Sequence, residues 1–447
     1  MGVPIKIEVE NIFGDYEHLF NRSARIFVGY SGGLDSTVLL HLACKYVKAG
    51  RVTALHVNHG LSSDADVWEQ HAERQSDELS ANFEAHRVSC QARINTEALA
   101  RDARYGVFEK TLAEDDILLL AHHADDQAET VLYNLLRGSG STGMSGIPVT
   151  RDLGLGRLLR PLLGRTKAQI KSYATRHRLK WIEDESNLDT SFDRNYLRHR
   201  ILPLIAERWA GHQNRIAVTA SQSKNDKSLA KSIFLNDLAK LDFRNDRAGI
   251  SFCAKRMSLL EAIRQKNIIR QLPGELKLSL PSTRVIDEVF DVLLNARSDA
   301  SPEVKADRCV FRRYRNRVYL LRVGKRHSIC PKNCINWELK KMLVLPGGGS
   351  VVAESIDSQG IRLGEATSLE IRFRLGGERC RPSGRRHSQT LKKLFQEYAL
   401  EPWWRSSIPL FFLHNELVAV GDLWVCEGWE TEKGEKGLKI HWQVNSL

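Results

Sequence analysis

The chain has 447 residues, of which 42% are hydrophobic, and 66 Lys and Arg against 54 Asp and Glu give it a formal net charge of +12. This length and hydrophobic content exclude a disordered chain or a single small core, so we expect two or three globular domains. The eight scattered cysteines exclude a disulfide scaffold and predict a cytoplasmic protein, and no apolar stretch is long enough to predict a membrane span. The positive charge favours a polyanionic partner, although solubility alone explains it equally well.

Short apolar runs and amphipathic stretches alternate from residue 26 to about residue 210. The predicted strands are residues 26–30, 52–57, 83–88 and 117–121, and the predicted helices are residues 37–49, 66–82, 95–112 and 125–137. This pattern predicts a doubly wound α/β domain over residues 1–212, with a parallel sheet whose ligands lie at the carboxyl ends of the strands.

Two further domains are predicted after this one. Residues 213–330 are expected to form a mostly helical middle domain, with a strong apolar period at residues 285–294 and strand-like alternation from residue 309. Three consecutive glycines at residues 347–349 mark a turn or linker, and residues 350–447 are expected to form a small α+β domain.

A glycine-rich loop between the first predicted strand and the first predicted helix has the sequence Ser31-Gly32-Gly33-Leu34-Asp35-Ser36. Backbone N–H groups in such a loop, with a helix N-terminus behind them, bind a pyrophosphate. A carboxylate beside phosphate is repelled, so we expect Asp35 to act through a bridging magnesium ion. The alternative is a tight turn in which Asp35 or Ser36 caps the helix. The loop lacks the Lys of a Walker A motif, which disfavours a kinase or GTPase.

Further polar motifs follow the loop in this order: HVNHGL at 56–61, EALARDARY at 97–105, AHHADDQAET at 121–130, RGSG at 137–140, RPLL at 160–163, DESN at 184–187 and RNYLR at 194–198. Asp126 and Glu129 are one helical turn apart, so they share a face and could hold magnesium or the ammonium groups of an amino acid. Arg101 and Arg104 share another predicted face, where they could stabilise phosphate charge or simply be solvated.

Together these motifs resemble the tRNA(Ile)-lysidine synthetase family of PP-loop ATP pyrophosphatases. The resemblance implies ATP and Mg²⁺ as cofactors, and isoleucine tRNA with a CAU anticodon and free L-lysine as substrates. The wobble cytidine would be adenylated at its C2 carbonyl oxygen with release of pyrophosphate, and the lysine ε-amine would then displace AMP. The lysidine formed would switch codon reading from AUG to AUA. A homodimer is a further possibility that the resemblance leaves open.

The resemblance also implies roles for individual residues. Catalysis is expected from Asp35, Arg101, Arg104, Asp126 and Glu129, and metal binding from Asp35 and Asp126. Binding of ATP is expected from the residues of the loop, named above, and from His56, Asn58 and His122. Contacts to tRNA are expected from Arg194, Arg198, Arg200 and the basic residues of the tail, which are Arg372, Arg374, Arg379, Arg381, Arg385, Arg386, Lys392 and Lys393.

Two other functions remain open at this point. A PP-loop tRNA thiolase shares ATP and tRNA but needs reactive cysteines, and the catalytic half contains only Cys44, inside a predicted helix, and Cys90. A non-catalytic RNA-binding protein with a nucleotide-sensing fold is the more distant alternative. Cys330 and Cys334 lack the second half of a zinc site, so we expect no metal role for them.

Overall fold

The structure is a computed structural model of the chain and describes residues 9–47, 50–60, 64–88, 96–183, 189–294, 296, 300, 302–323, 334–346, 349–357 and 360–444. The chain divides into two compact units, residues 1–229 and 230–447. Within the described ranges no helix combines the length and the hydropathy that a membrane span needs. The predicted DESN motif, Cys90 and Cys330 lie outside the described residues.

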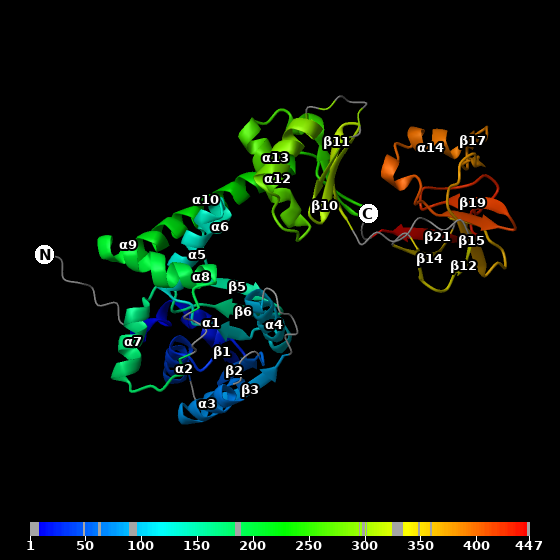
Figure 1. The fold of residues 1–447 in the computed structure, drawn as a ribbon. Coiled ribbons are helices and arrows are strands. Elements are labelled where there is room, and N and C mark those ends of the chain that lie inside the picture. Colours follow the sequence, from blue (N-terminus) through cyan, green and yellow to red (C-terminus); the bar gives the residue numbers. More distant parts are fainter. Residues whose placement is uncertain are drawn as a thin grey trace. The chain divides into compact units, whose positions relative to one another are not determined.

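The first unit is built on a six-stranded sheet with the order β3-β2-β1-β4-β6-β5 (Figure 1). Its strands are β1 (Ile26–Gly29), β2 (Val52–Asn58), β3 (Asn82–Arg87), β4 (Ile117–Leu119), β5 (Thr150–Leu153) and β6 (Gly156–Leu159). All neighbours are parallel except β5, which is antiparallel to β6.

Helices cover both faces of this sheet. They are α1 (Glu17–Arg22), α2 (Leu34–Tyr46), α3 (Ala65–Glu78), α4 (Thr96–Thr111), α5 (Ala124–Leu136), α6 (Ser141–Met144), α7 (Lys167–Arg176), α8 (Asp193–Tyr196) and α9 (Leu202–Arg208). Residues of β1 alternate between two cores, because successive side chains of a strand point to opposite faces. Val28 packs with Leu39 and Ile170 in one core, whereas Phe27 packs with Phe108 in the other. The predicted doubly wound fold is therefore confirmed.

The helix after the glycine-rich loop begins at Leu34, three residues before the predicted start, with Gly33 at the N-cap. The alternative prediction that Asp35 or Ser36 caps this helix is therefore wrong. Both residues lie in the first turn, where the helix N–H groups and the loop face the same space.

The second unit begins within α10 (His212–Lys240) and contains a five-stranded antiparallel sheet in its first part. The strands are β7 (Arg244–Asp246), β8 (Gly249–Cys253), β9 (Glu303–Ala306), β10 (Cys309–Tyr314) and β11 (Arg317–Arg322), and the helices are α11 (Ala254–Met257), α12 (Ala262–Glu275) and α13 (Thr283–Glu288). Helices were predicted here, but β7 and β8 were not, because short strands leave little periodic signal.

The C-terminal part of this unit is α+β, as predicted. Its strands are β12 (Ile335–Glu338), β13 (Leu343–Val344), β14 (Ser350–Asp357), β15 (Ser368–Arg372), β16 (Arg379–Cys380), β17 (Gln389–Thr390), β18 (Leu410–Leu413), β19 (Glu416–Val420), β20 (Trp424–Val425) and β21 (Lys436–Gln443), and its helix is α14 (Leu391–Glu397). A core that includes Trp337, Phe395, Phe411 and Trp404 joins these elements.

Candidate active site

The glycine-rich loop is held in shape by its two serines. Ser36 Oγ donates to Gly33 O at 3.1 Å, accepts from Ser31 N at 3.3 Å and lies 3.1 Å from Ser31 Oγ. Gly32 has a φ of +79°, which favours glycine, and its carbonyl accepts from Ile182 N at 2.9 Å. The loop is thus preformed at the carboxyl end of β1, where its N–H groups can bind phosphate oxygens.

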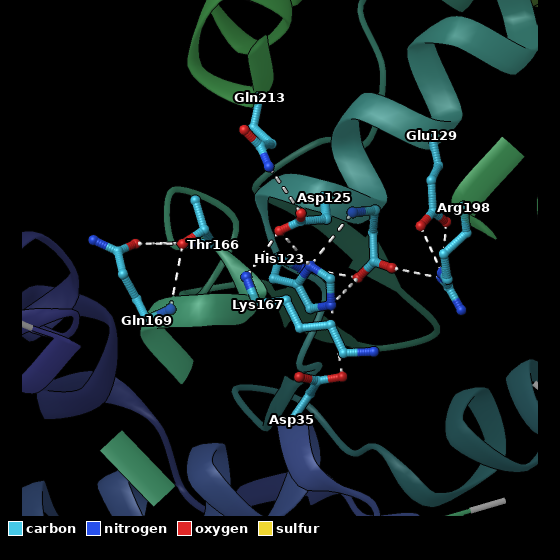
Figure 2. Close-up of polar contacts among 10 residues, drawn as sticks. Asp35, His123, Asp125, Glu129, Thr166, Lys167, Gln169, Arg198 and Gln213 are labelled. Carbon is cyan, nitrogen blue, oxygen red and sulfur yellow. Dashed lines mark hydrogen bonds and ion pairs between the residues drawn. The ribbon is translucent and has the colours of Figure 1, made fainter. Parts of the chain in front are cut away.

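Two acidic side chains that were predicted as magnesium ligands converge on His123. His123 Nε2 lies 3.6 Å from Asp35 Oδ2 and 3.5 Å from Asp126 Oδ2 (Figure 2). Burial alone lowers the pKa of His123, but the neighbouring carboxylates outweigh it and raise the pKa above 6.5. Asp35 Oδ1 is buried and has no hydrogen-bond partner among the described residues. Sequence reasoning assigned His123 no role, and its only signal was its place at the end of a predicted strand.

The other predicted pair of carboxylates is bound by an arginine. Arg198 Nε donates to Glu129 Oε1 at 2.6 Å, and its Nη2 donates to Glu129 Oε2 at 2.8 Å and to Asp126 Oδ1 at 3.2 Å. Burial raises the pKa of Glu129, and the Arg198 guanidinium opposes that shift. The short bidentate contact favours the ionised pair, so Arg198 lies among the charges of the candidate active site. The predicted contact of Arg198 with tRNA stays a prediction.

The backbone around Arg198 has an unusual form with a physical cause. Residues Leu197–Ile201 form a turn of π-helix, and Pro203 follows in the first turn of α9. Proline lacks an N–H group and its ring clashes with the carbonyl four residues earlier, which here belongs to His199. Widening the preceding turn relieves this clash, and π-turns of this kind often occur at functional sites.

The remaining polar residues of the AHHADDQAET motif build the walls of the site. Asp125 accepts from Lys167 N at 2.8 Å and from Gln213 Nε2 at 3.0 Å, so it ties α5 to the start of α7 and to α10. Gln127 accepts from Ile147 N at 2.6 Å and donates to Ile147 O at 3.3 Å. The N-cap of α5 is His123, whose side chain accepts from Asp126 N.

A cavity of about 620 Å³ lies next to these carboxylates. Five predicted site residues line it: Arg101, His122, Asp126, Glu129 and Arg194. Its walls thus bring guanidinium and carboxylate groups together, a combination that can bind an amino acid and a nucleotide side by side.

Other predicted residues make contacts within the protein. His56 is buried with its Nδ1 2.9 Å from Tyr30 O, and Asn58 Oδ1 accepts from Gly60 N while its Nδ2 donates to Glu69 at 2.8 Å. These contacts shape the end of β2. Arg104 and Arg200 are exposed.

Most predicted tRNA-binding arginines of the tail form ion pairs. Arg372 binds Glu370 with two contacts of 2.8 Å, and carboxylates also pair with Arg374, Arg381 and Arg385. Arg379 is exposed and donates to Ser388 O at 2.8 Å. Arg386, Lys392 and Lys393 are exposed and have no ion pair with any residue in the described ranges.

The parallel sheet, the serine- and glycine-rich loop and the acidic residues at its edge define a nucleotide-using PP-loop domain. A family model described as "PP-loop domain" matches residues 2–205, and models described as "TilS substrate binding domain" and "TilS substrate C-terminal domain" match residues 252–319 and 369–442.

Relatives named tRNA(Ile)-lysidine synthase match almost the whole chain. The one from Coxiella burnetii is 37% identical and covers 93% of this chain and 92% of its own. Those from Serratia proteamaculans and Photorhabdus laumondii are 35% and 33% identical, covering 94% and 98% of this chain and 95% and 99% of their own. The chain belongs to the tRNA(Ile)-lysidine synthase family and is a ligase with an ATP-using domain, which confirms the resemblance and decides against a non-catalytic RNA-binding protein.

Proposed function

We propose that this enzyme activates the wobble cytidine of the CAU anticodon of isoleucine tRNA with ATP and joins free L-lysine to C2. The product, lysidine, reads AUA in place of AUG. The observation that carries this proposal is the cavity lined by Arg101, Asp126 and Glu129, whose two carboxylates are bound by Arg198. The guanidinium of Arg101 suits a phosphate, and the carboxylates suit a cationic amino acid.

In the first step, we infer that the loop N–H groups and the hydroxyls of Ser31 and Ser36 bind the leaving pyrophosphate, while Arg101 stabilises charge at the α-phosphate. The residues fit magnesium because Asp35 Oδ1 is buried without a partner and Asp126 approaches the same histidine. No group of three protein ligands occurs in the described ranges, which suits an ion that keeps waters and phosphate oxygens. Magnesium, when bound, would neutralise charge on the leaving pyrophosphate.

In the second step, Asp126 and Glu129 would hold the ammonium groups of lysine. Arg198 binds both carboxylates through charge-assisted hydrogen bonds, which hold them at one wall of the cavity as acceptors. Because burial raises the pKa of Glu129, this carboxylate is suited to take the proton that the ε-amine must lose before it attacks C2.

Arg194, Arg200 and the basic residues of the tail would bind tRNA phosphates, with domain boundaries near residues 212, 330 and 350 as predicted. His56 and Asn58 would shape the ATP site rather than contact ATP, since their polar atoms are bonded within the protein. A cytoplasmic location follows from the substrates, and a homodimer is proposed from the family resemblance alone.

The proposal is tested by incorporation of labelled lysine into unmodified isoleucine tRNA with a CAU anticodon, using purified protein, ATP and magnesium. A methionine tRNA with the same anticodon is the control. We expect ATP-dependent label on the isoleucine tRNA alone. Pyrophosphate release without lysine transfer would overturn the assignment of the nucleophile, and absence of both would overturn the proposed reaction.

A further inference from the structure

Arg160, at the end of β6, is a buried arginine that binds three walls of the cavity. It is 3% exposed. Its Nε donates to His122 Nδ1 at 3.2 Å, its Nη1 to Pro148 O at 2.8 Å and its Nη2 to Tyr105 Oη at 3.3 Å. All four residues line the cavity, and the three partners come from the end of β4, the segment before β5, and α4.

The contact with Arg160 decides where His122 carries its proton. A guanidinium has only donors, so His122 Nδ1 must accept with its lone pair. The proton of the neutral ring is then on Nε2. The ring is half-buried and lines the cavity, and Nε2 has no hydrogen-bond partner among the described residues.

The surroundings of His122 also keep the ring neutral. Burial first, and then the charges of Arg160 directly after β6, of Arg101 on α4, of the adjacent His123 and of Arg104 on α4, lower its pKa to about 3. A second proton would have to sit on Nδ1, facing the Arg160 guanidinium, which geometry and charge both oppose.

We propose that His122 is a catalytic residue that donates a hydrogen bond from Nε2 and never acts as a base, and that Arg160 is the positioning residue that holds this tautomer. The proposal rests on the reaction proposed above. As lysine attacks, the N–C2 bond forms and the C2–O bond breaks, its electron pair stays on the oxygen of AMP, and the amine proton passes to a carboxylate. His122 follows β4, and the parallel neighbour of β4 is β1, which leads into the glycine-rich loop, so the N–H of His122 is suited to the phosphoryl oxygens of departing AMP. A neutral imidazole can supply such electrophilic assistance.

The first test reads the tautomer directly and needs no activity. Nitrogen NMR of protein labelled with ¹⁵N-histidine, with the His122 signal assigned from its loss in His122→Gln, should show protonated Nε2 and unprotonated Nδ1 from pH 6 to 8. In Arg160→Met, the His122 ring should populate both neutral tautomers, or its pKa should rise toward neutral pH. Arg157→Met is the matched control, because Arg157 is an exposed arginine of the same strand, and it should change nothing. A protonated Nδ1 in the wild-type protein would overturn the proposal whether or not lysidine is formed.

The second test separates a donor from a base. Glutamine keeps a neutral N–H donor, so His122→Gln should retain kcat within about tenfold with an unchanged pH profile, whereas His122→Ala should lose about 10²–10³-fold, as for a missing oxyanion donor. Equal losses in both variants, or removal of an ionisation from the pH profile by His122→Gln, would show that His122 acts as a base. If labelled lysine never transfers at all, the proposed reaction fails while the tautomer result stands.

Discussion

The cavity of the first unit and the arginine-rich segment of the second were both predicted as clusters of charge. In the structure, the arginines of the two regions differ in their bonding partners and in their exposure. Arg198 is bonded to two carboxylates of α5, about 70 residues earlier in the chain, and Arg160 is bonded to groups from three separate segments. Arg372 and Arg374 pair with carboxylates two and four residues away and remain partly exposed. Removing one partner of a buried ion pair costs about 3–5 kcal/mol in stability, whereas an exposed pair contributes about 0–1 kcal/mol. The clustering of charged residues in the sequence therefore does not show which of them are bonded inside a cavity and which lie at the surface.

The largest expected effect comes from Asp35 in the cavity. We expect Asp35→Asn to lower kcat by about 10²–10³-fold, because the variant loses the carboxylate proposed to hold the magnesium ion that would neutralise the leaving pyrophosphate. Filter binding should show unchanged affinity for tRNA. Asp77→Asn, on the exposed face of α3, is the control and should keep full activity. Weak tRNA binding by Asp35→Asn would mean that the loop serves tRNA binding rather than catalysis.

Arg198→Met should destabilise the protein as well as inactivate it. Removing the guanidinium leaves Glu129, which is 3% exposed, as an uncompensated buried carboxylate, at a cost of about 3 kcal/mol in the free energy of unfolding. Urea unfolding measures this loss, and the KM for lysine should rise. Adding Asp126→Asn and Glu129→Gln should recover most of the stability but no activity. Arg200→Met, an exposed neighbour, should stay within about 0.5 kcal/mol of wild type.

Basic residues of the tail should contribute differently to tRNA binding, depending on whether a carboxylate of the protein already pairs with them. Replacing both Lys392 and Lys393 by Ala should weaken tRNA binding and reduce the salt dependence of log K by about 1.4–1.8, as expected for two lost phosphate contacts. Arg372→Ala should change this slope less, because Glu370 and Asn415 already bind the guanidinium. Titrations at several salt concentrations measure the slopes, and equal slopes would contradict the distinction between paired and unpaired cations.

A smaller effect is expected from pH. Burial first, then the charges of Arg104 and His56, lower the pKa of His59 from 6.5 to about 4. The unfolded chain therefore binds this proton more tightly, so stability is complete above about pH 6.5 and declines as the pH falls toward 4. The urea concentration at the unfolding midpoint should fall less between pH 7 and pH 5 in His59→Asn than in the wild-type protein. An identical decline would mean that other groups control acid unfolding.

The smallest effect is expected from Cys44. Burial raises the pKa of its thiol to about 11, so the reactive thiolate is scarce near neutral pH. Cys44→Ser should leave lysine transfer unchanged, and iodoacetamide should label this residue slowly in the folded protein. Loss of lysine transfer in this variant would revive the thiolase mechanism.

Much of the catalytic unit followed from local patterns. The strand, the Ser31–Ser36 loop and the helix after it were predicted because each has a local signature, namely apolar alternation, glycines and 3.6-residue periodicity. The predicted start of that helix was late by three residues, since Leu34, Asp35 and Ser36 carry no apolar period of their own. The strands β7 and β8 were missed because they are short, and the pairing that places β8 in the sheet is with β11, far along the chain.

By itself, the sequence determined the fold class, the nucleotide-binding loop and the family, because motifs of closely spaced residues carry them. Only the tertiary structure decided which side chains meet. Arg198 lies 69 residues from Glu129 in sequence, and Arg160 lies 38 from His122. Parallel strands return to one edge only after a helix, so partners at that edge are necessarily distant in sequence. Their pairing, and with it the protonation of the cavity, depends on the assembled sheet.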